Sequence, residues 1–461
     1  MSARPRFCTF VTLVTRVRNK CGVKHDRLTN QPTNQMSKRM FTFKSKWIAL
    51  LAGLSLVTSP VFAGESGALL DVLIRKGVIS DQEAEDIRAD LSRESQEFVI
   101  ASVSGGKATN SIALSGRMQL QYAGLSTDQN VAATSQFFLR RIYFGVKAGV
   151  GADWTANLNY DFSGGNFDKA YMEWSGYAGG TPIALDFGLR KVNLGYEETT
   201  SSGSLKSIER SPVTRYFVEP NNGRRLGAAS YRIGAYLDGG DVNARKGKTS
   251  GFFFGAAATN PQRTESTGDG SVDGSKSSGS SATNTVALWA DAGYTGMFSG
   301  GKLKVGAAMG ILPDQGGVKN TALGKGYDMN VFSLYGDLTM GKFNLAGEYL
   351  SASVDNGAGV GKDASPSGYW IQPSFNLTEK VELVARLSSI DADGRGVKIS
   401  DGVRSSPAAN TGQKLEELFL GMTYTFVENG MKFQIGYTDS KLSDGSSENG
   451  SGVRSQMQID F

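Results

Sequence analysis

Apolar and polar residues alternate with a period of two from residue 112 to the end of the 461-residue chain. In the first alternating segment, Ile112, Leu114, Met118 and Leu120 fall on one side of the pattern, and polar or small residues fall between them. Because successive residues of a β-strand point to opposite faces, this pattern predicts strands with one apolar and one polar face. The same alternation recurs in residues 154–162, 303–311, 431–438 and 453–461.

The spacing of the sixteen predicted strands distinguishes a barrel from a soluble β-sandwich, which would alternate in a similar way. Connections after even-numbered strands are mostly tight, whereas those after odd-numbered strands are mostly long and polar: 193–224, 260–284, 312–327 and 391–414. This alternation is typical of outer-membrane barrels, with periplasmic turns and extracellular loops. We therefore predict an all-β fold, a 16-stranded antiparallel transmembrane β-barrel. Its strands begin near residues 112, 138, 153, 169, 183, 225, 251, 285, 302, 328, 342, 368, 380, 415, 431 and 453, and the sixth alternates least clearly.

Such a barrel implies a water-filled pore in a bacterial outer membrane. A closed barrel satisfies every backbone group internally, as lipid requires, and sixteen strands leave an aqueous lumen. Aromatic residues such as Trp154 and Tyr349 recur near strand ends, where a membrane-interface girdle is expected. The last strand ends on Phe461, which resembles the terminal signal that the outer-membrane assembly machinery reads. We therefore expect Phe461 to act as an assembly signal.

The N-terminal region predicts export. A basic segment at 40–46 precedes an apolar stretch at 47–57, and small residues follow as far as Ala63, where we expect cleavage of a signal peptide. Residues 1–35 resemble no targeting element, so we expect translation to start at Met36 or Met40, which makes 1–63 a mis-called start plus signal peptide. Residues 64–98 then form a short helical periplasmic segment, and residues 99–461 form the barrel.

Charge and composition exclude several classes of protein once residues 1–63 are set aside. That segment holds 11 of the 49 basic residues and one of the 44 acidic residues, so the remaining chain carries 38 basic and 43 acidic residues, a net charge of −5. We therefore expect no nucleic-acid partner. Both cysteines and the single histidine also lie in 1–63, which argues against a metal site, a cofactor or an enzyme with a histidine base.

Four short motifs carry a resemblance to a known family. They are Gly188-Leu-Arg-Lys, Glu197-Glu-Thr-Thr-Ser-Ser, Glu209-Arg and Gly223-Arg-Arg-Leu-Gly. In this order they resemble the phosphate-selective porin O and P family, and the resemblance spans residues 112–461. It implies a homotrimer of sixteen-stranded barrels surrounded by outer-membrane lipid, in which the third extracellular loop folds into each pore.

If the loop narrows the pore, its charges bear on which ions pass. Residues 190–225 carry seven basic and four acidic side chains, a local charge of +3. A cationic narrowing favours anions, and arginine suits phosphate oxygens, but arginine–carboxylate pairs could instead simply hold the loop to the wall. The candidate pore-constriction and anion-binding residues are Arg190, Lys191, Arg210, Arg215, Arg224 and Arg225, and the candidate loop-anchoring residues are Glu197, Glu198 and Glu209.

Polar-face charges on the other strands are mixed in sign and form no continuous row of arginines. Three functions follow as hypotheses. The first is an outer-membrane porin for small hydrophilic solutes and ions that favours small anions such as phosphate. The second is a general, non-selective porin. The third is a structural barrel that contacts the cell wall through its N-terminal helices. The mixed charges are Arg117, Arg141, Lys147, Lys304, Arg386, Lys432 and Arg454 against Asp161, Glu173, Asp186, Asp337, Glu348 and Glu382.

Overall fold

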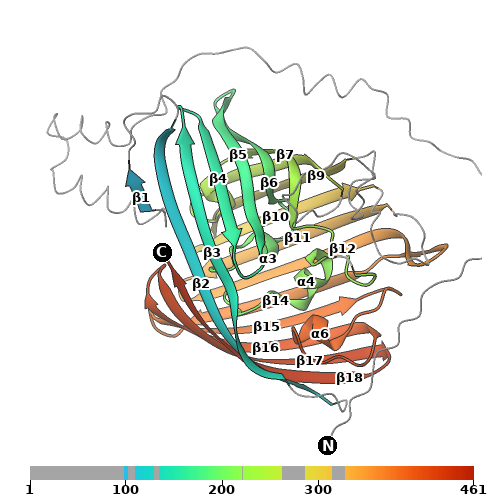
Figure 1. The fold of residues 1–461 in the computed structure, drawn as a ribbon. Coiled ribbons are helices and arrows are strands. Elements are labelled where there is room, and N and C mark those ends of the chain that lie inside the picture. The colour runs from blue at the N-terminus through green and yellow to red at the C-terminus, as the bar shows by residue number, and fades with distance from the viewer. Residues whose placement is uncertain (1–97, 102–108, 129–133, 221, 262–285, 314–327) are drawn as a thin grey trace, which may run out of the picture. The chain divides into compact units, whose positions relative to one another are not determined.

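The computed structural model describes residues 98–101, 109–128, 134–220, 222–261, 286–313 and 328–461. The strands in these ranges form one antiparallel sheet (Figure 1). The expected signal peptide, its cleavage site and the helical residues 67–95 lie outside the described ranges and stay predictions. The strands are β1 (Phe98–Ala101), β2 (Thr109–Thr127), β3 (Thr134–Val150), β4 (Trp154–Asp161), β5 (Asn166–Ala178), β6 (Thr181–Lys191), β7 (Tyr231–Gly240), β8 (Gly251–Thr259), β9 (Ala287–Phe298), β10 (Gly301–Leu312), β11 (Met329–Met340), β12 (Phe343–Gly359), β13 (Lys362–Ala364), β14 (Ser367–Asn376), β15 (Val381–Asp391), β16 (Gly412–Val427), β17 (Met431–Gly445) and β18 (Glu448–Asp460).

The sheet closes on itself as a barrel. Each barrel strand pairs with its neighbours in sequence, and β18 pairs with β2 from Gly450 opposite Thr127 to Asp460 opposite Arg117. Sixteen strands complete the ring, because β13 only extends the hairpin above β12 and β1 pairs only with β2. The predicted fold is confirmed: a closed, 16-stranded antiparallel β-barrel.

The two faces of the strands differ as the sequence pattern predicts. On β2, Met118 and Leu120 point outward and are 46% and 41% exposed, whereas Gln119 and Gln121 point inward and are fully buried. The inward glutamines are hydrogen-bonded across the seam to Gln458 and Gln456 of β18, at 2.7 and 2.8 Å. The barrel therefore has an apolar outer face and a polar inner face.

Fifteen strands begin within five residues of the predicted positions, but the sixth does not. It was expected near residue 225, and β7 begins at Tyr231. The backbone ahead of β7 is engaged elsewhere, because Leu226 N donates to Tyr216 O at 3.0 Å and Ala228 N donates to Phe217 O at 2.7 Å. These bonds hold residues 224–229 against a helix inside the barrel.

Within the described residues, four short helices lie in the connections between strands. None of the described helices is long and apolar enough to cross a membrane. Helices α3 and α4 belong to the connection between β6 and β7, which we call the inward loop (residues 192–230), and both are seen within the ring of strands in Figure 1. The helices are α3 (Tyr196–Thr199), α4 (Pro212–Val218), α5 (Val242–Arg245) and α6 (Ile399–Gly402).

Candidate pore and the loop that narrows it

The inward loop is held by an apolar core inside an otherwise polar barrel. All seven residues of α4 are buried, and Val213, Tyr216 and Phe217 belong to the same buried cluster as Leu350 of β12 and Trp370 of β14. Burial of an aromatic side chain stabilises a fold by about 1.5–3 kcal/mol. The loop is therefore packed against the wall on the β12–β15 side of the barrel.

Local sequence explains where α4 begins. Ser211 caps the helix, since its Oγ accepts a hydrogen bond from Thr214 N at 3.1 Å. Pro212 follows at the first helical position, where no backbone donor is needed. The Ser-Pro pair thus starts a helix at the point where the loop reaches the wall.

The predicted anchoring residues all bind the loop. Glu197 accepts hydrogen bonds from Ser211 N within the loop, at 2.8 Å, and from Arg386 Nη1 on the wall, at 3.1 Å. Glu198 pairs with two cations, and Glu209 pairs with Arg140 on β3 at 2.7 Å. Burial alone would raise the pKa of Glu209, but Arg140 and the other arginines around it hold that pKa well below its usual value.

Glu348 of β12 is a further anchor, which the sequence placed on the inner face without a role. Its Oε1 accepts from Tyr196 N at 2.8 Å and its Oε2 accepts from Glu197 N at 3.3 Å. Trp370 Nε1 and Ser333 Oγ donate to the same carboxylate, at 3.1 and 2.8 Å. Four neutral donors therefore fix the start of α3 to the wall.

All six predicted constriction cations are engaged in ion pairs. Arg190 pairs with Asp186 and with Asp238, and Lys191 and Arg210 share Glu198. The remaining three form a cluster in which Arg215 and Arg225 pair with Glu219, and Arg224 and Arg225 pair with Asp401. Arg224 lies 2.5 Å from Asp401, and Arg210 lies 3.1 Å from Glu198.

This second cluster joins the inward loop to the connection between β15 and β16 (residues 392–411), which we call the β15–β16 loop. Asp401 is fully buried in that loop, and Arg404 reaches back to Glu219 at 2.6 Å. Burial favours the neutral form of Glu219, but Arg215, Arg404 and Arg225 outweigh it and lower its pKa to about 2. Ion pairs therefore hold the inward loop and the β15–β16 loop together.

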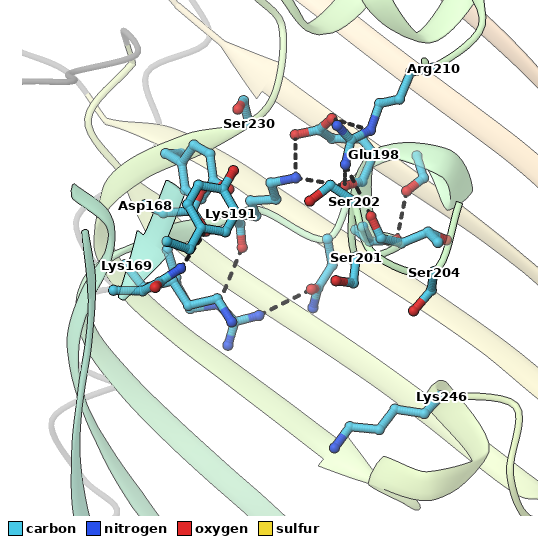
Figure 2. Close-up of a pocket in the computed structure, with 18 of the residues that line it drawn as sticks. Asp168, Lys169, Lys191, Glu198, Ser201, Ser202, Ser204, Arg210, Ser230 and Lys246 are labelled. Carbon is cyan, nitrogen blue, oxygen red and sulfur yellow. Dashed lines mark hydrogen bonds and ion pairs between the residues drawn. The ribbon is translucent and has the colours of Figure 1, made fainter. Parts of the chain in front are cut away.

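A cavity of about 1690 Å³ remains beside the inward loop, along the wall from β2 to β11. It is lined by sixteen basic and eleven acidic side chains, a surplus of five positive charges. Five of the predicted constriction cations line it, and Arg224 does not. On the loop side, Ser201, Ser202 and Ser204 face this space (Figure 2).

The cavity is also lined by lysines that lack a carboxylate partner, which we call the wall lysines. Of these, the sequence pattern had pointed only to Lys304, as one of the polar-face charges of mixed sign. Among the described residues, Lys246, Lys248 and Lys304 line the cavity without forming an ion pair. Lys246 extends from the α5 turn into open space in Figure 2, and burial together with the neighbouring ammonium groups of Lys248 and Lys147 lowers its pKa. For Lys246 and Lys248, only their basic character could have suggested a role.

Aromatic rings, rather than carboxylates, hold Lys304. Its Nζ lies 5.2 Å from the ring centroid of Tyr196 in the inward loop, 5.5 Å from that of Tyr335 on β11, and 5.7 Å from that of Phe253 on β8. Such cation–π contacts position an ammonium group without neutralising it. Lys304 therefore keeps a net positive charge where the loop meets the wall.

A closed 16-stranded barrel with a polar lumen and an inward-folded loop defines the class of outer-membrane channel-forming barrels. The model of the family "phosphate-selective porin O and P" matches residues 112–461. The chain belongs to this family, as its motifs suggested, and its place is the bacterial outer membrane.

One characterised relative and one solved structure support this assignment. Porin O of Pseudomonas aeruginosa is 24% identical over 306 residues, which cover 58% of this chain; the match spans 64% of the length of that relative. The outer-membrane channel DcaP of Acinetobacter baumannii superposes with a TM-score of 0.50 at 12% identity, over 78% of this chain and 100% of that one. The second likeness shows the barrel fold alone.

Proposed function

We propose that the protein is a porin through which small hydrophilic solutes and ions diffuse passively, with a preference for anions such as phosphate. The observation that carries this proposal is the cavity of about 1690 Å³ beside the inward loop, with its surplus of five positive charges. Membership of a family described as phosphate-selective supports the same direction. A positive lining lowers the electrostatic barrier for anions.

We infer that the anion preference arises mainly from cations of the barrel wall and less from the loop cations that the sequence suggested. The candidates Arg190, Lys191 and Arg210 line the cavity, but each faces a carboxylate that offsets much of its field. Lys246 and Lys304 lack such a carboxylate and face the same space. We therefore propose that the loop cations mainly shape the constriction, while the wall lysines supply most of the net field.

We extend the proposal to a homotrimer. Residues 134–139 of β3 pair with β2 alone, because the shorter β4 pairs only with Tyr143–Val150. This leaves a strand edge unpaired among the described strands, beside Phe137 and Leu139, which are 72% and 51% exposed. An unpaired strand edge beside exposed apolar side chains is a template for pairing with another chain, and a second copy of this chain fits it.

A planar-bilayer recording tests the transport proposal. The purified protein is added to a bilayer that separates two KCl concentrations, and both the conductance and the zero-current potential are measured. We expect stable open steps with a potential of the sign that chloride preference produces. A zero potential would identify a general porin, and a barrel that opens no channel would favour the structural alternative.

A further inference from the structure

A second, much smaller cavity adjoins the main cavity and shares Glu209, Arg210 and Arg404 with it. Its volume is about 20 Å³, which is enough for one particle of the size of a water molecule. The inward loop, the β15–β16 loop and the inner face of β15 to β18 enclose it. Its charged lining is unbalanced, with the four arginines Arg210, Arg386, Arg404 and Arg454 against the two glutamates Glu209 and Glu417.

Arg454 of β18 is the least compensated of these groups. Arg454 is 6% exposed, and its guanidinium forms no ion pair with any described residue. It donates from Nη1 to Gln121 Oε1 at 3.3 Å and from Nη2 to the backbone oxygen of Arg404. Neutral acceptors satisfy hydrogen bonds but leave the buried charge in place, and an uncompensated buried charge costs several kcal/mol.

The two glutamates beside the cavity cannot also neutralise Arg454. Glu417 receives hydrogen bonds from Arg386 Nη2 at 3.0 Å and Nε at 3.2 Å, and both side chains are almost fully buried. Glu209 is held by Arg140 at 2.7 Å and lies 3.5 Å from Arg404. The other three lining arginines do have carboxylate partners, since Arg210 pairs with Glu198, Arg386 with Glu417 and Arg404 with Glu219. Among the described residues, the uncompensated charge at this cavity is therefore that of Arg454.

We propose that this cavity binds one small inorganic anion of the size of chloride, which ties β18 to the two inward-folded loops. A water molecule would fill the space but would leave the charge of Arg454 uncompensated, whereas a monovalent anion offsets it. A cavity of this size favours a small anion over a large organic anion such as gluconate. Arg454 lines this cavity and not the main one, and the site does not depend on the proposed transport function.

The site predicts a stabilising effect that depends on anion size. A ligand that binds only the folded protein raises its stability as the ligand concentration rises. We expect the heat-denaturation midpoint of the purified protein to be higher in chloride or bromide than in gluconate of equal ionic strength, by roughly 2 °C or more. The midpoint should rise with chloride concentration and then saturate.

Crystals grown in sodium bromide test the site directly. We expect an anomalous-scattering peak of bromide in the cavity, within about 3.5 Å of a guanidinium nitrogen of Arg454 or Arg386. An ordered water with no anomalous signal at this position would overturn the proposal. A bromide peak would also overturn the proposal if the denaturation midpoint were the same in chloride and in gluconate, because the bound ion would then not stabilise the fold.

Two variants connect the peak to the charge. Arg454→Met removes the guanidinium with little change in volume, and we expect both the bromide peak and the chloride effect to be lost. Arg141→Met is the matched control, because Arg141 is also buried without an ion pair among the described residues but lines only the main cavity. If R454M retains the chloride effect, or if R141M loses it equally, the assignment to this cavity is wrong.

Discussion

Arg386 on β15 donates from Nη1 to Glu197 Oε1 of the inward loop across 3.1 Å, and the two side chains are 2% and 5% exposed. The same guanidinium holds Glu417 on the neighbouring strand. One buried cation therefore joins α3 of the loop to the wall, and the two residues are 189 positions apart in sequence. We expect the position of the loop, and with it the width of the pore, to depend on this contact.

Replacing Arg386 by Met should loosen the inward loop. It leaves Glu197 and Glu417 buried without their cation, and removal of one partner from a buried ion pair costs about 3–5 kcal/mol. We expect a lower denaturation midpoint, together with a larger and noisier single-channel conductance. Lys414→Met is the control, because its pairs with Asp391 and Asp444 are about half exposed and contribute less than about 1 kcal/mol. Unchanged conductance in R386M would show that α4 packing alone holds the loop.

Acid should release the cluster around Glu219. The folded-state pKa of this carboxyl is about 2, below the unfolded value near 4.5, so it stabilises the fold above pH 4.5. This contribution, on the order of 3 kcal/mol, is lost as the pH falls from about 4.5 through about 2. We expect the channel current to become unstable in this range. Glu219→Gln should show the instability already at pH 7 and should lose the acid transition; a transition identical to wild type would assign it to another carboxyl.

Phe461 should be required for efficient assembly. Its backbone exchanges two hydrogen bonds with Gly116 of β2, at 2.6 and 3.1 Å, and its ring covers this glycine closely enough that a Cβ there would lie 2.3 Å from it. Deleting Phe461 should therefore sharply reduce the heat-modifiable barrel in the outer membrane while synthesis continues. Phe461→Tyr keeps the ring and the backbone bonds and should assemble normally. Normal amounts of folded protein after the deletion would contradict the predicted signal.

The uncovered edge of β3 gives a prediction about assembly of the trimer. Phe137→Lys places a charge beside the unpaired edge and should convert the trimer to monomers in unheated gel samples. Leu387→Lys is the comparison, because Leu387 is 58% exposed on β15, where both neighbouring strands are paired. Dissociation by both variants alike would mean that a charge on the outer face, rather than this edge, is responsible.

The barrel could be predicted from the sequence because the pattern that indicates each strand lies within that strand. Every strand repeats a two-residue period, and the turns alternate in length, so fifteen strands could be placed from neighbouring residues alone. The sixth was misplaced because residues 224–229 bond to α4 instead of to a strand. That competition involves residues about ten positions away and leaves no mark in the alternation.

The candidate site was predictable only as an inventory of charges. The charged residues of the loop sum to +3 in the sequence. The carboxylates that neutralise this surplus come from distant segments, as Asp401 does for Arg224 and Arg225. Which cations remain without a neutralising carboxylate depends on how the side chains pair in the folded barrel. Lys304 illustrates this, because its aromatic contacts come from three separate elements.

The balance between loop and wall cations can be measured as ion selectivity. Replacing Lys246, Lys248 and Lys304 together by Met removes three cations that form no ion pair among the described residues. We expect the zero-current potential in a KCl gradient to move toward cation preference with the trimer intact, because only charges within about 8–10 Å of the permeating ion escape screening.

The corresponding loop variant carries Ala at Arg190, Lys191 and Arg210. It should also shift the potential toward cation preference, because it frees Asp186, Asp238 and Glu198, but it should lower the denaturation midpoint as well. The lysine variant should leave that midpoint nearly unchanged. This difference separates cations that supply the field from cations that hold the loop. If the lysine variant has the wild-type potential while the loop variant shifts, selectivity lies in the loop residues as the sequence alone indicated.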